Sequence, residues 1–143
     1  MCNGENEQKK KYLQRYGEAK MAEKELAEQL EELEGRYILP SKVLDDMPHG
    51  TSKSDLSSFA AQYDALYNKL IRAYNRTVTV QKEILDAIDA MPTGETLKTI
   101  LRYRYIHGKK WEEMAVIMDY TYQWVCELHG RALQNFTIPK RNS

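Results

Sequence analysis

The sequence predicts an all-α protein in which a long antiparallel, coiled-coil-like helical hairpin precedes a small domain of short helices. Charged residues make up 29% of the 143 residues, and helix-forming Glu, Lys, Leu, Ala and Gln occur throughout. Only 7 glycines and 4 prolines interrupt the chain. Apolar residues recur at steps of three and four over two long segments. Together these features favour helices over strands or low-complexity sequence.

The first long segment, residues 8–37, is predicted to form an amphipathic helix. It contains no proline, and only Glu23 interrupts its apolar positions. We expect this helix to weaken at Gly35 and to end before Pro40, because proline disfavours the helical conformation in the residue before it. The predicted apolar positions are Tyr12, Tyr16, Ala19, Leu26, Leu30, Leu33 and Tyr37.

Residues 38–53 are predicted to connect the two long helices. Prolines, a glycine and a cluster of Ser, Thr and Lys are typical of such a connector. Ser52 or Ser54 is the expected N-cap of the helix that follows, because a serine hydroxyl can accept a bond from a free backbone N–H.

The second long segment, residues 54–91, has no glycine or proline before Met91 and forms a second apolar seam. A helix of this length needs a partner along it. We expect the first helix to fold back on it, and an oligomer to cover what remains. The polar Thr77 and Gln81 could fix the register of such a pairing. The seam comprises Leu56, Ala60, Tyr63, Tyr67, Leu70, Tyr74, Thr77, Gln81, Ile84, Ile88 and Met91.

Residues 92–143 are predicted to form a second domain, separate from the hairpin of residues 1–91. Thr93 is the expected cap of a helix that runs to about Ile106. Gly108 is the expected left-handed residue that ends it. The apolar face of this helix is predicted to comprise Leu97, Ile100, Leu101 and Tyr105.

The net charge of zero conceals a difference between the two predicted domains. Residues 1–91 carry 13 basic and 16 acidic side chains, whereas residues 92–143 carry 8 basic and 5 acidic ones. This asymmetry favours an assembly role for the first part and an anionic partner for the second.

Residues 111–130 match the spacing of a helix-turn-helix unit. The small Ala115 lies where the two helices would touch, Asp119 lies where the turn requires a positive φ, and Thr121 can cap the second helix. An ordinary helical hairpin is the alternative interpretation. The predicted core of the unit comprises Trp111, Met114, Ala115, Met118, Tyr120, Val125 and Leu128.

In such a unit the second helix lies in the major groove of duplex DNA, and its N-terminal half contacts base edges. With Val125, Leu128 and Ala132 facing inward, Gln123 could pair with adenine and Glu127 could accept a bond from cytosine. The predicted base-contacting residues are Tyr122, Gln123, Cys126 and Glu127. The predicted backbone-contacting residues are Lys109, Lys110, Thr121 and Arg131.

The C-terminal third resembles region 4 of the primary sigma factors. The resemblance rests on Leu101 to Gly108, on Trp111 to Ala115, on Tyr120-Thr121, and on Arg131-Ala132-Leu133. The chain also has a long helical N-terminal part, a Met-Pro-x-Gly element at Met47 to Gly50, and a C-terminal His-Gly-Arg-Ala-Leu run at His129 to Leu133. In these features the whole chain is similar to small phage and prophage proteins with a sigma-like C-terminus, related to regulators of the ArpU and RinA type. The resemblance implies activity in phage transcription, RNA polymerase as a candidate partner, and an ion pair between Arg104 and Glu113.

The expected function is therefore that of a cytoplasmic, phage-type transcriptional regulator that binds duplex DNA and forms homo-oligomers. The alternatives are a small terminase-like DNA-packaging subunit and a coiled-coil protein-interaction module that does not bind DNA. Neither a phosphate-binding loop nor a metal-ligand pattern occurs, so we expect no enzyme activity, no cofactor and no metal. The two distant cysteines favour no disulfide, and no apolar run is long enough for a membrane partner.

Overall fold

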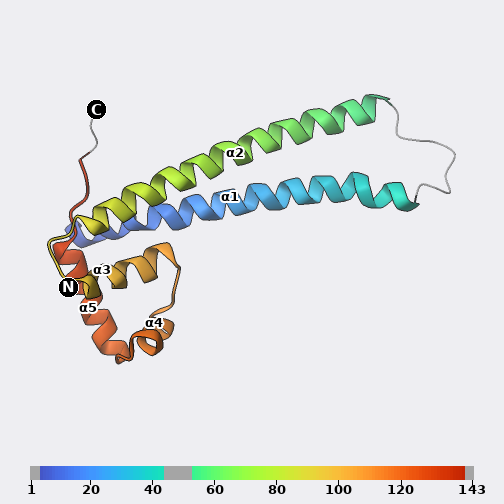
Figure 1. Cartoon of the computed structure of the whole chain (residues 1–143). Coiled ribbons are helices and arrows are strands. Elements are labelled where there is room, and N and C mark those ends of the chain that lie inside the picture. Colours follow the sequence, from blue (N-terminus) through green and yellow to red (C-terminus); the bar gives the residue numbers. More distant parts are fainter. Residues whose placement is uncertain (1–3, 44–52, 141–143) are drawn as a thin grey trace. The chain divides into compact units, whose positions relative to one another are not determined.

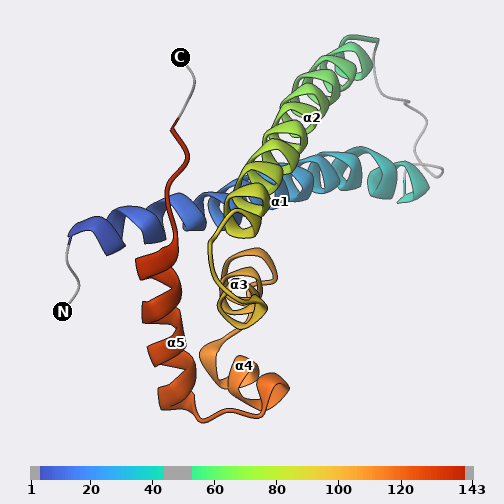
Figure 2. The same cartoon turned by 60° about the vertical axis from the view of Figure 1, so that its left-hand side comes forward.

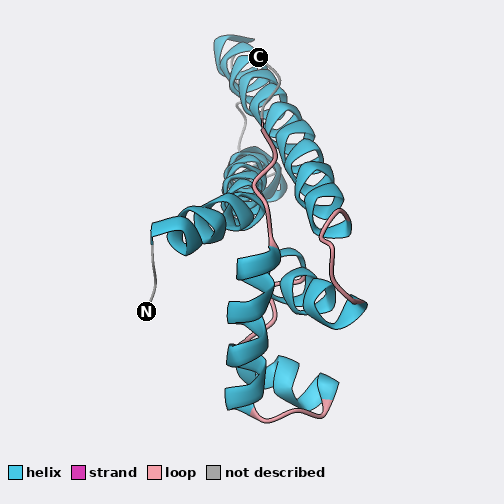
Figure 3. Ribbon diagram, turned by 90° about the vertical axis from the view of Figure 1, so that its left-hand side faces the viewer, coloured by secondary structure: helices cyan, strands magenta, loops and turns pink. Residues whose placement is uncertain are grey.

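The computed structural model describes residues 4–43 and 53–140, and in these ranges the chain is all-helical, as predicted (Figures 1 and 3). None of the helices in these ranges has the length and apolar character needed to cross a membrane. The elements are α1 (Gly4–Val43), α2 (Lys53–Asp89), α3 (Glu95–Leu101), the π-helical turn η2 (Arg102–Ile106), α4 (Trp111–Met118) and α5 (Tyr122–Asn135).

Helix α1 is longer than predicted, since it continues past Gly35 and Pro40 to Val43. The expected end before Pro40 is wrong. Proline lacks one N–H but has a φ compatible with the helix, and here it lies in the last turn, where little helix follows it. Ser54 is not the N-cap of α2, because that helix already begins at Lys53. The remainder of the predicted connector, Ser52 and the side chain of Tyr37 lie outside the described residues.

Contacts divide the chain into two compact units. Unit 1 comprises the described residues of Met1–Ala19 and Val78–Ser143, and unit 2 comprises those of Lys20–Thr77. The predicted boundary between residues 91 and 92 does not coincide with this division. The reason is that Leu13 of α1 and Ile84 of α2 share one core with Phe136, beyond α5.

Unit 2 pairs the second part of α1 with the first part of α2. Leu30 and Leu33 of α1 are buried, and burial, then the charge of Glu34 on α1, raise the pKa of Tyr63 on α2. The buried Thr77 donates its hydroxyl hydrogen to the carbonyl oxygen of Ala73 at 2.9 Å. The predicted seam of α2 is only partly covered, because four of its members are exposed. These are Leu56, Ala60, Tyr67 and Tyr74.

Unit 1 is built around one large apolar cluster, to which both α1 and the segment after α5 contribute. Lys9 of α1 donates from Nζ to the carbonyl oxygen of Leu133 at 2.8 Å, near the end of α5. Gln81 donates to the hydroxyl of Tyr16, so this polar seam position has a partner on α1. The buried members of the cluster are Leu13, Val80, Ile84, Ala87, Ile88, Met91, Leu101, Ala132, Leu133 and Phe136.

Helix α3 packs against α5 in unit 1 (Figure 2). The N-cap residue of α3 is Gly94, so the prediction that Thr93 caps this helix is wrong by one residue. The Thr93 hydroxyl donates to the carbonyl oxygen of Gly94 instead. The helical run does end at Ile106, and its last five residues form η2. Gly108 has a φ of 64°, which confirms the predicted left-handed residue.

Candidate nucleic-acid interface

A short turn with a left-handed residue joins α4 to α5. Asp119 ends α4 with φ 57° and ψ 46°, the conformation that the sequence pattern requires there. An L-residue pays a steric cost in this region, and Asp is among the residues that tolerate it best. Thr121 then caps α5, since its Oγ1 accepts a hydrogen bond from the backbone N–H of Trp124 at 3.1 Å. These two residues set the change in direction between the helices.

A second, smaller apolar cluster fixes α4 against α5. Met114 of α4 and Val125 and Leu128 of α5 are buried together with Ile100 of α3. Among the other predicted core residues, Trp111, Ala115 and Met118 are half-buried and pack against this cluster.

Tyr120 is the exception, because its side chain is 37% exposed although the pattern predicts it in the core. Its backbone N–H donates to the carbonyl oxygen of Ala115 at 2.9 Å. The turn therefore uses the backbone of Tyr120 to close α4, and leaves the ring at the surface.

The first turns of α5 present a mixed surface to solvent. Tyr122, Gln123 and Glu127 are exposed, whereas Cys126 is half-buried. The charge of Cys126, and then its hydrogen bond to Tyr122, raise the pKa of Tyr122. Three of the four predicted base-contacting residues are therefore open, and the fourth is engaged with its neighbour on the same helix face.

Arg131, the predicted phosphate contact on α5, is already partnered. Its Nη2 donates to Oε1 of Glu127 at 3.1 Å, and its guanidinium lies 5.1 Å from the ring centroid of Trp124. Both members of the ion pair are more than half exposed. Such pairs contribute at most about 1 kcal/mol, so a phosphate could replace Glu127 at little cost.

The expected ion pair between Arg104 and Glu113 is wrong, since the described residues form none between these two. Arg104 donates to the carbonyl oxygen of Lys109 at 3.1 Å and lies 4.2 Å from the ring centroid of Trp111. Glu113 instead accepts a bond from the backbone N–H of Lys110 at 3.1 Å, at the start of α4. Glu113 thus takes over half of the capping that Lys110 cannot provide.

Lys109 is half-buried and Lys110 is exposed, so these two predicted backbone contacts lie at the N-terminal end of α4. Residues 109–136 carry three basic and four acidic side chains. The charge of this segment alone does not attract duplex DNA strongly.

The sequence analysis did not predict the half-buried polar contact between His129 and Tyr105. Burial, and then the charges of Lys10 and Arg104, lower the pKa of His129 to about 4. Burial raises the pKa of Tyr105 to about 12. The position of His129, one turn after Val125 on the inward face, signals its burial, but no local signal indicates a partner 24 residues away.

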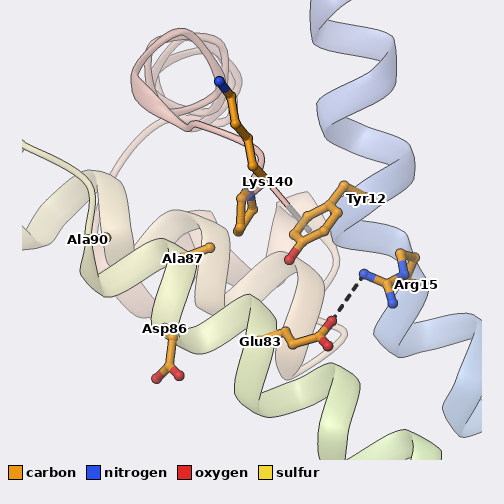
Figure 4. Close-up of a pocket in the computed structure, with 8 residues that line it drawn as sticks. Tyr12, Arg15, Glu83, Asp86, Ala87, Ala90 and Lys140 are labelled. Atoms are coloured by element: carbon orange, nitrogen blue, oxygen red, sulfur yellow. Dashed lines mark hydrogen bonds and ion pairs between the residues drawn. The ribbon is translucent and has the colours of Figure 1, made fainter. Parts of the chain in front are cut away.

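A hollow of about 640 Å³ lies elsewhere in unit 1, between α1, α2 and the segment after α5 (Figure 4). Arg15 and Glu83 point toward each other across it and form an ion pair of 3.3 Å. Tyr12 and Lys140 also line it. No group of three or more potential metal ligands gathers here or elsewhere in the described part of the chain.

No protein-family model, no curated protein and no solved structure matches this chain.

Proposed function

We propose that this protein is a transcriptional regulator of phage type that binds duplex DNA through a helix-turn-helix formed by α4 and α5. The observation that carries the proposal is the turn itself. Asp119 adopts the left-handed conformation and Thr121 caps the next helix, at the spacing that this class of unit requires. A left-handed end residue and a Thr cap also occur in ordinary helical hairpins, so what supports the proposal is their spacing within residues 111–130.

The exposed half of α5 supports the same function. Gln123 lies in the first turn and carries both a donor and an acceptor, which suits the paired groups of adenine in the major groove. Thr121 caps α5, Lys110 precedes α4, and Arg131 follows Glu127 by one turn of α5. In this proposal these residues contact phosphates and position the helix.

One copy of this interface would bind weakly, because the segment carries more acidic than basic side chains. The function therefore includes association through the long helices, so that two α5 helices contact one duplex together. RNA polymerase is the second partner of this proposal, by the likeness of the C-terminal third to sigma region 4.

Selection from a random pool of duplexes, followed by binding at two salt concentrations, tests the proposal. We expect an enriched motif, and we expect the Gln123→Ala variant to fold normally but to prefer a different motif. Gln134→Ala is the matched control, since Gln134 is an exposed glutamine near the other end of α5. An identical preference in all three proteins would remove Gln123 from the base-contacting set. Enrichment of no motif, with strongly salt-dependent binding, would favour DNA packaging.

A protein-interaction module is the second candidate, and one observation favours it. The outer face of α4 exposes Val116 to 82% and Ile117 to 50%, beside the acidic Glu112 and Glu113. Exposed apolar side chains ringed by charge are typical of protein-binding surfaces. Absence of duplex binding at low salt would favour this function over regulation through DNA.

A further inference from the structure

Helix α2 has two apolar faces within unit 2, and only one of them contacts α1. The covered face follows Tyr63, Leu66, Leu70, Ala73 and Thr77, which are buried or half-buried. The other face follows Tyr67, Ile71 and Tyr74, at steps of four and three. These side chains are exposed to 46%, 41% and 53%. We call this second face the α2 stripe.

The two faces are offset by one position in the sequence: Leu70 belongs to the covered face, and the next residue, Ile71, belongs to the α2 stripe. One residue corresponds to about 100° around an α-helix. A helix that contacts two neighbours at about this angle is typical of a four-helix bundle, whereas a helix in a two-stranded pair has one seam. The pattern of α2 therefore indicates a second neighbour beyond α1.

A groove of about 600 Å³ runs beside the α2 stripe in the same unit. Leu70, Ile71 and Tyr74 form one wall. The other is lined by α1 residues Lys20, Glu23, Lys24 and Ala27, of which Lys20 and Glu23 form an ion pair. Ile71 and Tyr74 of the α2 stripe are thus part of the groove wall. A two-fold axis through this face would place the stripe of each copy over the groove of the other.

The charges of unit 2 complement each other between copies. Residues 20–36 of α1 carry three basic and six acidic side chains, whereas residues 56–77 of α2 carry three basic and one acidic. In the described part of the unit, Arg72 and Arg76 of α2 and Glu28 and Glu31 of α1 form no ion pair. These charges are available to a partner that presents the opposite sign at the same places.

We infer that unit 2 is a homodimerisation surface, in which the α2 stripe of one copy packs over the groove of a second copy. In this arrangement Arg72 and Arg76 of one copy's α2 lie beside Glu28 and Glu31 of the other copy's α1. The result is a four-helix bundle of two chains. This inference deepens the proposed function, which needs two linked copies, but the association itself is measured without DNA.

Sedimentation equilibrium over a range of protein concentrations tests the interface. We expect a dimer for the unmodified chain, and at least a tenfold increase in the dissociation constant for Ile71→Glu or Tyr74→Glu. Met21→Glu is the matched control, because Met21 is 67% exposed and does not line the groove. It lies six residues before Ala27, which places it about 120° around α1 from that residue. A monomer at every concentration, or a dimer that Ile71→Glu leaves unchanged, would overturn the inference.

Charge exchange identifies which helices pair. The double variant Arg72→Glu/Arg76→Glu should lose self-association, as should Glu28→Lys/Glu31→Lys. A mixture of the two should form a heterodimer, because each α2 then faces an α1 of opposite charge. Circular dichroism checks that each variant stays helical, which exposed positions permit. A mixture that remains monomeric would exclude this pairing.

The two proposals fail separately. A dimer that binds no duplex would leave the interface standing and contradict the proposed function. A monomer that binds a specific duplex would do the reverse. A ring of eight or more copies would contradict the two-fold bundle and favour DNA packaging.

Discussion

The hydroxyl of Tyr105 lies 2.8 Å from Nε2 of His129, in a half-buried contact between η2 and α5. The ring of Trp111 meets the His129 ring edge-on, with centroids 4.7 Å apart. The pKa of His129 is lowered to about 4 and that of Tyr105 is raised to about 12, so both groups are neutral at pH 7. The contact therefore joins two uncharged partners in the wall between the two apolar clusters of unit 1.

Acid should destabilise unit 1 through His129. The unfolded chain takes up a proton near pH 6.5, whereas folded His129 does so only near pH 4. The contribution of His129 to the free energy of unfolding is fully present above about pH 6.5 and is lost as the pH falls to about 4. The loss is at most about 3 kcal/mol. Chemical denaturation at several pH values measures it. In His129→Gln the slope between these limits should be smaller, and an unchanged slope would contradict the prediction.

Replacing Trp111 with alanine should destabilise unit 1 by about 2–4 kcal/mol, at the lower part of the range for a large aromatic residue because Trp111 is half-buried. The loss includes its contacts with His129 and Arg104. Thermal and denaturant melts measure the effect. Trp111→Phe keeps an aromatic face and should lose less than half as much; equal losses would show that the ring contacts are not what stabilises this position.

Asp119→Gly should stabilise unit 1 by up to about 1 kcal/mol, because glycine adopts a φ near 57° without steric cost. The same substitution at Asp86, in the helical part of α2, should destabilise by about 1 kcal/mol. The opposite signs of the two changes separate a turn effect from a general effect of glycine. Destabilisation by both would contradict the left-handed turn.

Glu127→Ala should strengthen binding to a duplex of random sequence at low salt, where no base contact of Glu127 is lost, because it releases Arg131 from its ion pair. Arg131→Ala should weaken binding and reduce the slope of log affinity against log salt by about 1. Fluorescence anisotropy measures the first effect with the random duplex and the second with the selected duplex. If Arg131→Ala leaves the slope unchanged, Arg131 contacts no phosphate.

The helical class and the turn between α4 and α5 were predictable from the sequence, because both depend on local rules. Apolar spacing predicts helices, and the roles of Asp119 and Thr121 follow from backbone conformation and capping within a few residues. The end of α1 was not predictable by the same rules. Pro40 disfavours a helix but does not forbid one in its last turn.

Other errors came from partners that are distant in the sequence. Spacing alone cannot show that Arg104 prefers the Trp111 ring and the Lys109 carbonyl to Glu113. Spacing likewise cannot show which of the two apolar faces of α2 is covered by α1. For that reason Tyr67 and Tyr74 were expected in one seam with Tyr63. The division into units was hidden for the same reason, since it depends on Leu13 packing in one core with Phe136.

The bond from Lys9 to Leu133 spans 124 positions of the chain. A core that joins such distant segments has a high contact order, and it forms slowly because a long loop must close first. During synthesis, unit 1 cannot be completed until α5 has left the ribosome, whereas all of unit 2 has emerged long before. The antiparallel segments of unit 2 are therefore expected to pair first and to bring residues 4–19 back toward the segment that begins at Val78. A ribosome-stalled chain ending before α5 should accordingly protect unit 2 from proteolysis and leave residues 4–19 open to it.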